Sequence, residues 1–257
     1  MNKTQYKFGS NIYNKFSQLT TKEQLTIGIK ILHLQAQILF FNRFYWFIAG
    51  IFGYFIIAYI INYNNDMINR VSQEDVLLAL FMLPFAVLAI LLNMQVISRE
   101  KDNRTLEVMF TTSGSRYKVW ILRLVTLNLI LLTLSILFST FVFFTFTEIE
   151  IIATGIHAFV PTFFLGSMTL YFAVKFRSGF AAGMWSFGIL LLILMFSEPL
   201  DETKYSLFFN PYDIPRRLDP ETWNLWMWQN RIAVLLFGCF LQFMALRGLE
   251  NREKMLS

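Results

Sequence analysis

Charged residues, cysteine and histidine are all scarce in this chain of 257 residues. Charged residues make up 15% of it, whereas roughly a quarter is usual in soluble domains, so the composition argues against a water-soluble fold. The single cysteine, Cys239, excludes an internal disulfide framework and a cysteine-based metal site. The two histidines, His33 and His157, lie far apart in the sequence, and no metal site is expected.

The sequence also lacks the short motifs that mark many enzymes. It contains no GxxxxGK[ST] segment, so the chain has no phosphate-binding loop of its own for ATP. It contains no HExxH, CxxC or GxSxG either. We therefore expect a non-catalytic chain that binds no cofactor itself.

Apolar residues are abundant instead. The chain is 56% hydrophobic and 18% aromatic, with 29 Phe and a mean hydropathy of +0.50. Stretches of about 20 apolar residues are long enough to cross a bilayer as helices. We predict an all-α integral membrane protein with Pro84 and Pro161 kinking two of its helices. The predicted spans are roughly residues 44–61, 76–97, 121–146, 151–176, 180–196 and 232–246.

The positive charges fall mainly on one side of these spans. Because cytoplasmic loops are enriched in Lys and Arg, this distribution places both termini and the loop after the second span in the cytoplasm. It also explains the net charge of +5 without a nucleic-acid partner. No charged residue falls near the centre of any predicted span, where proton-driven pumps usually place one. The five exceptions to the cytoplasmic bias are Arg70, Lys204, Arg216, Arg217 and Arg231.

Two further segments have helical signals. Residues 20–23, TTKE, form a capping box, and polar and apolar residues then occupy opposite faces up to residue 43. We interpret residues 20–43 as an amphipathic helix in the cytoplasmic interface, the alternative being a helix of a small soluble domain. Residues 197–230 carry turn signals and three Trp, which indicates either short re-entrant helices at the outer leaflet or a loop with an aromatic belt.

A charged segment, EKDNRTLEVMF at residues 100–110, interrupts the apolar pattern between the second and third spans. Together with SGSR at residues 113–116, it resembles the cytoplasmic loop of ABC-2 type exporter permeases, whose pattern is close to E-[KR]-E-x-G-T-L-E-x-L-L followed by P-x-S-R. Arg104 and Ser113 depart from the usual Gly and Pro of that family. The predicted six-span layout, the interfacial helix and the long external loop resemble it as well, so the likeness extends over nearly the whole chain.

The resemblance implies a type V ABC exporter architecture in the plasma membrane of a prokaryote. It implies that the charged loop forms a coupling helix, docked on a separate ATPase subunit that holds ATP and Mg²⁺, and that a second permease copy completes the transporter. The apolar side chains would fill a groove on the partner, and the charges would set register and partner choice. The expected coupling residues are Arg99, Glu100, Lys101, Asp102, Arg104, Thr105, Leu106, Glu107, Met109 and Phe110.

We expect residues 1–257 to form a single transmembrane domain, with a cytoplasmic segment at 1–43, spans within 44–246 and a cytoplasmic tail at 247–257. The apolar spans and external aromatic residues suit a lipid-linked or amphipathic cargo. Membrane lipids are also expected as partners, because they surround any such chain. The residues expected along a substrate pathway are Asn93, Asn128, His157 and Trp185. The alternatives are a lipid-modifying enzyme, for which Glu148 and Glu150 are the nearest acids, and a secondary transporter.

Overall fold

The computed structural model describes residues 44–64, 76–102, 116–200 and 203–249, together with six residues between 20 and 30. The chain divides into two compact units, Met1–Arg43 and Phe44–Ser257. Every element described in the second unit is a helix, which confirms the all-α class for these residues. The helices are α3 (Phe44–Asn64), η3 (Val76–Met82), α5 (Leu83–Asp102), α7 (Arg116–Thr145), α8 (Ile151–Phe176), α9 (Gly179–Met195), α10 (Ser197–Leu200) and α11 (Pro220–Gly248).

Four stretches of helix are long and apolar enough to cross a membrane: Leu77–Val96, Trp120–Thr145, Ile151–Phe176 and Pro220–Gly248. Two shorter apolar helices, within α3 and α9, accompany them. This length and composition give the chain the character of a membrane protein. The apolar segments predicted from the sequence all lie on these helices, and the bounds predicted for residues 151–176 match those of α8.

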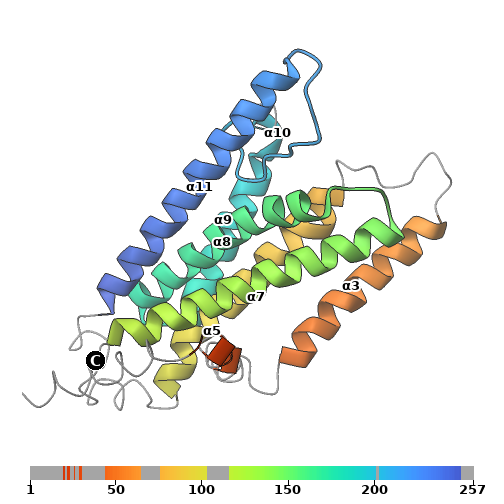
Figure 1. The fold of residues 1–257 in the computed structure, drawn as a ribbon. Coiled ribbons are helices and arrows are strands. Elements are labelled where there is room, and N and C mark those ends of the chain that lie inside the picture. The colour runs from red at the N-terminus through yellow and green to blue at the C-terminus, as the bar shows by residue number, and fades with distance from the viewer. Residues whose placement is uncertain are drawn as a thin grey trace, which may run out of the picture. The chain divides into compact units, whose positions relative to one another are not determined.

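Successive long helices run in alternating directions (Figure 1). The α5–α7 connection therefore lies at the same end of the second unit as the α8–α9 turn and the last residue of α11. We call this the α5–α7 end. The opposite end, which we call the α9–α11 end, carries the α7–α8 turn and residues 203–219.

The helix α8 is the centre of the bundle, in contact with α5, α7, α9 and α11. Its apolar stretch is 61% buried within the protein, whereas that of α11 is only 17% buried. Small residues permit this close packing: a Cβ on Gly166 would lie 2.6 Å from Asn93 Nδ2 of α5, and one on Gly238 of α11 would lie 2.6 Å from Phe163 Cε1. Membrane helices commonly approach each other at such small residues.

Hydroxyl groups on the buried surface of α8 are satisfied by the helix itself. Thr162 Oγ1 donates to Ala158 O at 2.8 Å, and Ser167 Oγ donates to Phe163 O at 2.7 Å. Thr169 Oγ1 donates to Leu165 O at 2.8 Å. These bonds back to the preceding turn leave no hydroxyl of the three unpaired in an apolar interior. The helix continues past Pro161, which lies inside it.

Pro84 accounts for a local change of helix type. The π-helix η3 ends at Met82, and the α-helix α5 begins at the next residue. In a π-helix the carbonyl of Ala79 would accept a hydrogen bond from the residue five positions later, which is Pro84 and has no N–H. Tyr54 of α3 supplies a donor instead, since its hydroxyl lies 2.8 Å from Ala79 O. The same tyrosine thereby joins α3 to η3.

Aromatic contacts hold α3 against the rest of the second unit. The rings of Phe52 and Phe55 lie 4.9 Å and 4.6 Å, centroid to centroid, from the ring of Phe138 on α7. Most other large side chains of α3 are exposed, including Ile57 and Tyr63. One side of α3 therefore packs on the bundle, and the remainder is apolar surface that a membrane could cover.

The last helix begins earlier than the sequence predicts. We expected a span over residues 232–246 and separate short helices within 197–230, but α11 is continuous from Pro220 to Gly248. Asp219 caps its N-terminus by accepting a hydrogen bond from the Glu221 N–H at 3.2 Å, and Pro220 occupies the first turn, where its missing N–H is harmless. The three Trp therefore lie on this helix, and α10 is the only short helix among the residues described between 197 and 219.

In the first unit, the described residues show part of the predicted capping box. The backbone N–H of Thr20 donates to Glu23 Oε2 at 2.9 Å, which is the return bond of such a box. Residues 22, 23, 26, 29 and 30 are helical, and Thr26 Oγ1 donates to Lys22 O at 2.8 Å. The predicted helix thus starts as expected, while its interfacial position stays a prediction.

Candidate functional site

The charged segment that resembles the ABC-2 loop is placed by the helices on either side of it. Helix α5 extends to Asp102 and helix α7 starts at Arg116, so the segment connects two long apolar helices at the α5–α7 end. Residues 103–115 lie outside the described part of the chain, as do the side chains of residues 97–102. The coupling roles that the resemblance implies therefore stay predictions. They concern Arg99, Glu100, Lys101, Asp102, Arg104, Thr105, Leu106, Glu107, Met109 and Phe110.

The four residues predicted for a substrate pathway lie at separate places. Asn93 is 2% exposed between α5 and α8 and donates to Ala89 O, one turn earlier, at 2.9 Å. Trp185 is 60% exposed on α9, next to Phe176, and Asn128 is half-buried on α7. His157 is buried at the α9–α11 end. Within the described residues, no hydrogen bond or ring contact joins any two of the four.

Beside His157 lies a buried guanidinium, which the charge pattern had assigned to the external side but not to any site. Arg231, on α11, is 3% exposed. Its Nε lies 3.4 Å from His157 Nδ1, its Nη2 donates to Phe209 O at 2.7 Å, and its Nη1 lies 3.5 Å from Asn230 Oδ1. Because Nδ1 faces an N–H donor, this geometry requires a neutral imidazole at His157.

Arg231 lies within the described helix α11 rather than in the loop before it. It is the twelfth of the 29 residues of α11, whereas the predicted span began just after it. A signal was present in the sequence, because Arg231 is the only charged residue between Glu221 and Arg247. Polar residues next to Arg231 interrupt the apolar sequence of α11, so the predicted span started after them.

Asn230 and Arg231 together attach residues 203–212 to the helices. Asn230 Nδ2 donates to the carbonyl oxygens of Lys204, at 3.0 Å, and Ser206, at 2.8 Å. Arg231 adds its bond to Phe209 O. These side chains satisfy three backbone carbonyls that belong to no helix, which stabilises the loop in one conformation.

Two further contacts attach the same loop. The hydroxyl groups of Tyr212 and Thr154 lie 2.7 Å apart, and the ring of Phe209 stacks on Trp223 at 4.3 Å between centroids. Burial raises the pKa of the Tyr212 phenol, the hydrogen bond to Thr154 lowers it, and the charge of Glu150 raises it. Tyr212 therefore stays protonated at neutral pH and can keep its hydrogen bond to α8.

The Asn230 bonds predict a specific effect of an isosteric change. Replacing Asn230 by Asp keeps an acceptor beside Arg231 but turns a carboxylate oxygen toward two backbone carbonyls. With each lost hydrogen bond worth about 1 kcal/mol, the open population of residues 203–219 should rise by about tenfold or more. Trypsin cleavage after the exposed Arg216 or Arg217, timed by mass spectrometry, measures this opening.

The matched control is Asn224→Asp, the same chemical change on the exposed face of α11. It should leave the cleavage rate within about twofold of the unchanged protein, because it breaks none of the bonds of Asn230. Equal cleavage rates in the two variants would show that Asn230 does not hold the loop.

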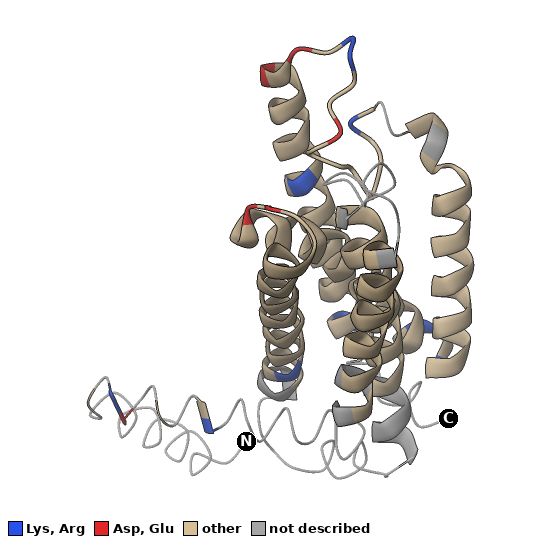
Figure 2. Cartoon of the chain, turned by 90° about the vertical axis from the view of Figure 1, so that its right-hand side faces the viewer, with Lys and Arg blue, Asp and Glu red and all other residues tan. Residues whose placement is uncertain are grey.

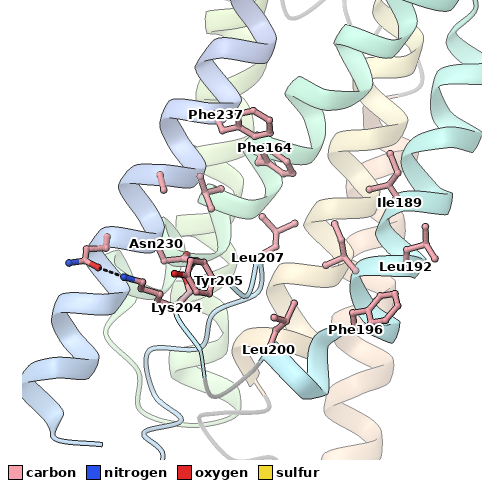
Figure 3. Close-up of a pocket in the computed structure, with 14 residues that line it drawn as sticks. Phe164, Ile189, Leu192, Phe196, Leu200, Lys204, Tyr205, Leu207, Asn230 and Phe237 are labelled. Carbon is pink, nitrogen blue, oxygen red and sulfur yellow. Dashed lines mark hydrogen bonds between the residues drawn. The ribbon is translucent and has the colours of Figure 1, made fainter.

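A cavity of about 730 Å³ lies between α8, α9, α11 and this loop (Figure 3). Side chains of α9 form one wall, including Ile189 and Leu192, and face those of α8 and α11. Lys204 and Asn230 lie at its polar end. The volume falls in the range of roughly 300–1,000 Å³ that is typical of ligand pockets.

Charge is distributed unevenly along the second unit (Figure 2). All acids in this unit whose side chains the structure describes lie at the α9–α11 end. Lys175, Arg177 and Arg247 mark the opposite end, next to the connection from α5 to α7. The acids at the α9–α11 end are Glu148, Glu150, Asp213, Asp219 and Glu221.

No family model, curated protein or solved structure matches this chain.

Proposed function

We propose that the chain is the membrane subunit of an ATP-driven exporter of the ABC-2 type. The observation that carries this proposal is the position of the EKDNRTLEVMF segment, which connects two long apolar helices at one end of the bundle. The family likeness assigns docking of an ATPase to a loop in this place. A segment that only oriented the helices in the membrane would need Lys and Arg alone, whereas this one also carries acids and apolar residues.

The proposed topology has six crossings with both termini in the cytoplasm of a prokaryote. The four long apolar helices supply four crossings, and α3 and α9 supply the other two. The cytoplasmic assignment rests on the Lys and Arg count of the whole sequence, because the described basic residues lie at both ends of the unit: Lys175, Arg177 and Arg247 at one, and Lys204, Arg216 and Arg217 at the other. The acids at the α9–α11 end then face outward.

The packing of α5 supports a route for force from the loop. Helix α5 ends at the charged segment and contacts both α8 and α9. Met94 of α5 lies against Gly183 of α9, where a Cβ would come within 2.7 Å of its sulfur, and Asn93 lies against Gly166 of α8. Because packed cores transmit strain, a displacement of the loop would move α8 and α9 with α5.

In this proposal the chain itself binds no nucleotide. ATP and Mg²⁺ are bound by a separate ATPase subunit, and a second permease copy, identical or related, completes the pathway. The exposed apolar faces of α3 and α9 provide surface for that copy and for membrane lipids. The cargo is amphipathic or lipid-linked.

Purification from the native membrane in mild detergent tests the proposal. Mass spectrometry should find an ATPase subunit at about one per permease, and it should be lost when Leu106 is replaced by Asp, which places a charge on the predicted apolar ridge. Replacing Leu137 by Asp, on an exposed apolar surface of α7, is the matched control for that substitution and should retain the ATPase among the molecules that insert. A chain that purifies alone from the unchanged strain would refute the proposal.

One observation favours a second candidate, a membrane-embedded enzyme. Glu150 and His157 line the same hollow of about 570 Å³, beside Trp228. A carboxylate and an imidazole in one hollow are a common pair for proton transfer. Replacing Glu150 by Gln would abolish such an activity, whereas an exporter subunit should retain its ATPase partner and its coupled hydrolysis after the same change.

A further inference from the structure

The cavity between α8, α9 and α11 has walls that suit a hydrocarbon chain. Its lining from these three helices is mostly apolar and includes Val234. Phe164, Ile189 and Phe237 line the same space (Figure 3). The space, about 730 Å³, is open on one side and has the size of a ligand pocket. An apolar occupant would gain from removing this surface from water.

The cavity opens sideways, between α9 and α11. Three of its lining side chains remain about half exposed on the outer surface of the bundle: Leu192 at 54%, Phe196 at 60% and Phe237 at 52%. In a membrane, lipid can reach this surface wherever a second copy does not cover it. A bilayer lipid could therefore place an acyl chain in the cavity without passing through the aqueous phase.

The polar end of the cavity carries one formal charge. Among its lining residues Lys204 is the only one that is charged at neutral pH; Asp201 and Glu202 lie outside the described residues. The Lys204 ammonium lies 3.5 Å from Gln229 Oε1 and 5.6 Å from the centre of the Tyr205 ring. An anionic group at this end would meet the Lys204 cation beside the side-chain amide of Gln229, and a cation with a hydrogen-bonding neighbour is a common arrangement in phosphate sites.

The backbone that presents Lys204 is held in place. Asn230 lines the cavity and donates to the carbonyl oxygens of Lys204 and Ser206, and both Asn230 and its neighbour Arg231 are buried. The polar end also lies near the α9–α11 end of the bundle, while Phe164 and Phe237 lie deeper between the helices. The apolar side chains of Phe196 and Leu200 also lie toward that end, so Lys204 is a single charge beside an otherwise apolar space.

We infer that this cavity binds one anionic phospholipid of the bilayer, with an acyl chain among Phe164, Ile189 and Phe237 and the phosphate beside Lys204. The site is separate from the charged segment at the α5–α7 end, and it needs a membrane but no ATPase. It thus goes beyond the proposed export function. Either assignment can fail while the other stands.

Photolabelling in vesicles tests the site. The purified full-length protein is placed in phosphatidylcholine vesicles that contain a trace of a photoreactive lipid. The anionic probe is phosphatidylglycerol with a diazirine in one acyl chain, and the zwitterionic probe is phosphatidylcholine with the same labelled acyl chain. Peptide mass spectrometry should find α9 and α11 peptides labelled at residues 189–196 and 233–237, with more label from the anionic probe. Replacing Lys204 by Gln should lower that labelling about three- to tenfold, to the level of the zwitterionic probe, while Lys204→Arg retains it.

Two controls separate the cavity from the general lipid surface. Val234→Trp fills the space and should reduce labelling by both probes, while the melting temperature in detergent verifies that the variant is folded. Label at Phe243, on an exposed part of α11 away from the cavity, should be equal for the two probes and unaffected by either substitution. Equal cavity labelling by the two probes, labelling unchanged by Lys204→Gln, or protein–protein crosslinks from a second copy in the cavity would each overturn the inference.

Discussion

Replacing Glu107 by Lys is expected to abolish substrate-stimulated ATP hydrolysis in the assembled transporter. In the proposed function, this acid lies within the segment that docks on the ATPase. Reversing its charge would place a Lys against the positive group that the acid is expected to face on the ATPase. Such a juxtaposition costs several kcal/mol, so coupled hydrolysis should fall by more than about tenfold. ATPase activity of the reconstituted complex, with and without cargo, measures the effect.

Insertion should survive this change, because an added Lys on the predicted cytoplasmic side agrees with the positive-inside rule. The matched control is Glu148→Lys, which makes the same reversal at the α9–α11 end. It should leave the coupled rate within about twofold of the unchanged protein. If hydrolysis remained coupled after Glu107→Lys, the segment would not be the docking site.

Replacing Gly155 by Leu should destabilise the bundle, because this glycine lies against the backbone of a neighbouring helix. A Cβ at this position would lie 2.9 Å from Ile136 Cγ1 and only 3.1 Å from the Ile136 Cα of α7. A side chain can rotate away, but a backbone atom moves only if the helices separate. That movement would also break the bond from Ser135 Oγ to Gly155 O, which is 3.0 Å long. We expect a loss of about 2–3 kcal/mol.

The melting temperature of the protein in detergent measures this loss. Gly188→Leu on α9 is the control, because nothing lies within 4 Å of a Cβ added there. That substitution should be neutral or slightly stabilising, since Leu is a better helix former than Gly. Neither glycine has a positive φ, so backbone strain does not enter the comparison. Equal melting temperatures of the two variants would contradict the close packing of α7 and α8.

Helix positions could largely be predicted from local sequence. The bounds of α8 matched because polar residues lie directly on both sides of the apolar run, Glu150 before it and Arg177 after it. The start of the first-unit helix was predictable from Thr20 and Glu23, three residues apart. In each case the information lies within one helical turn.

The start of α11 was missed for a related reason. Residues 197–230 were predicted to be an external loop and residues 232–246 a span, so the boundary was placed next to Arg231. Polar residues can continue a membrane helix when other parts of the fold satisfy them. Here the backbone carbonyl oxygens of residues 204–209 accept hydrogen bonds from Asn230 and Arg231. These pairings follow from the three-dimensional structure and not from the local sequence.

By itself the sequence determined that this is a chain of apolar helices, roughly where they lie, and where a charged segment interrupts them. Those properties follow from composition and from contacts between near neighbours. Only the tertiary structure decided that α8 is the central helix, that α9 and α11 enclose a cavity, and that Arg231 joins His157 to Phe209. A helix that is apolar on every face does not reveal which face is buried, and Arg231 lies 74 residues from His157. Pairing over such separations depends on how all the helices pack together.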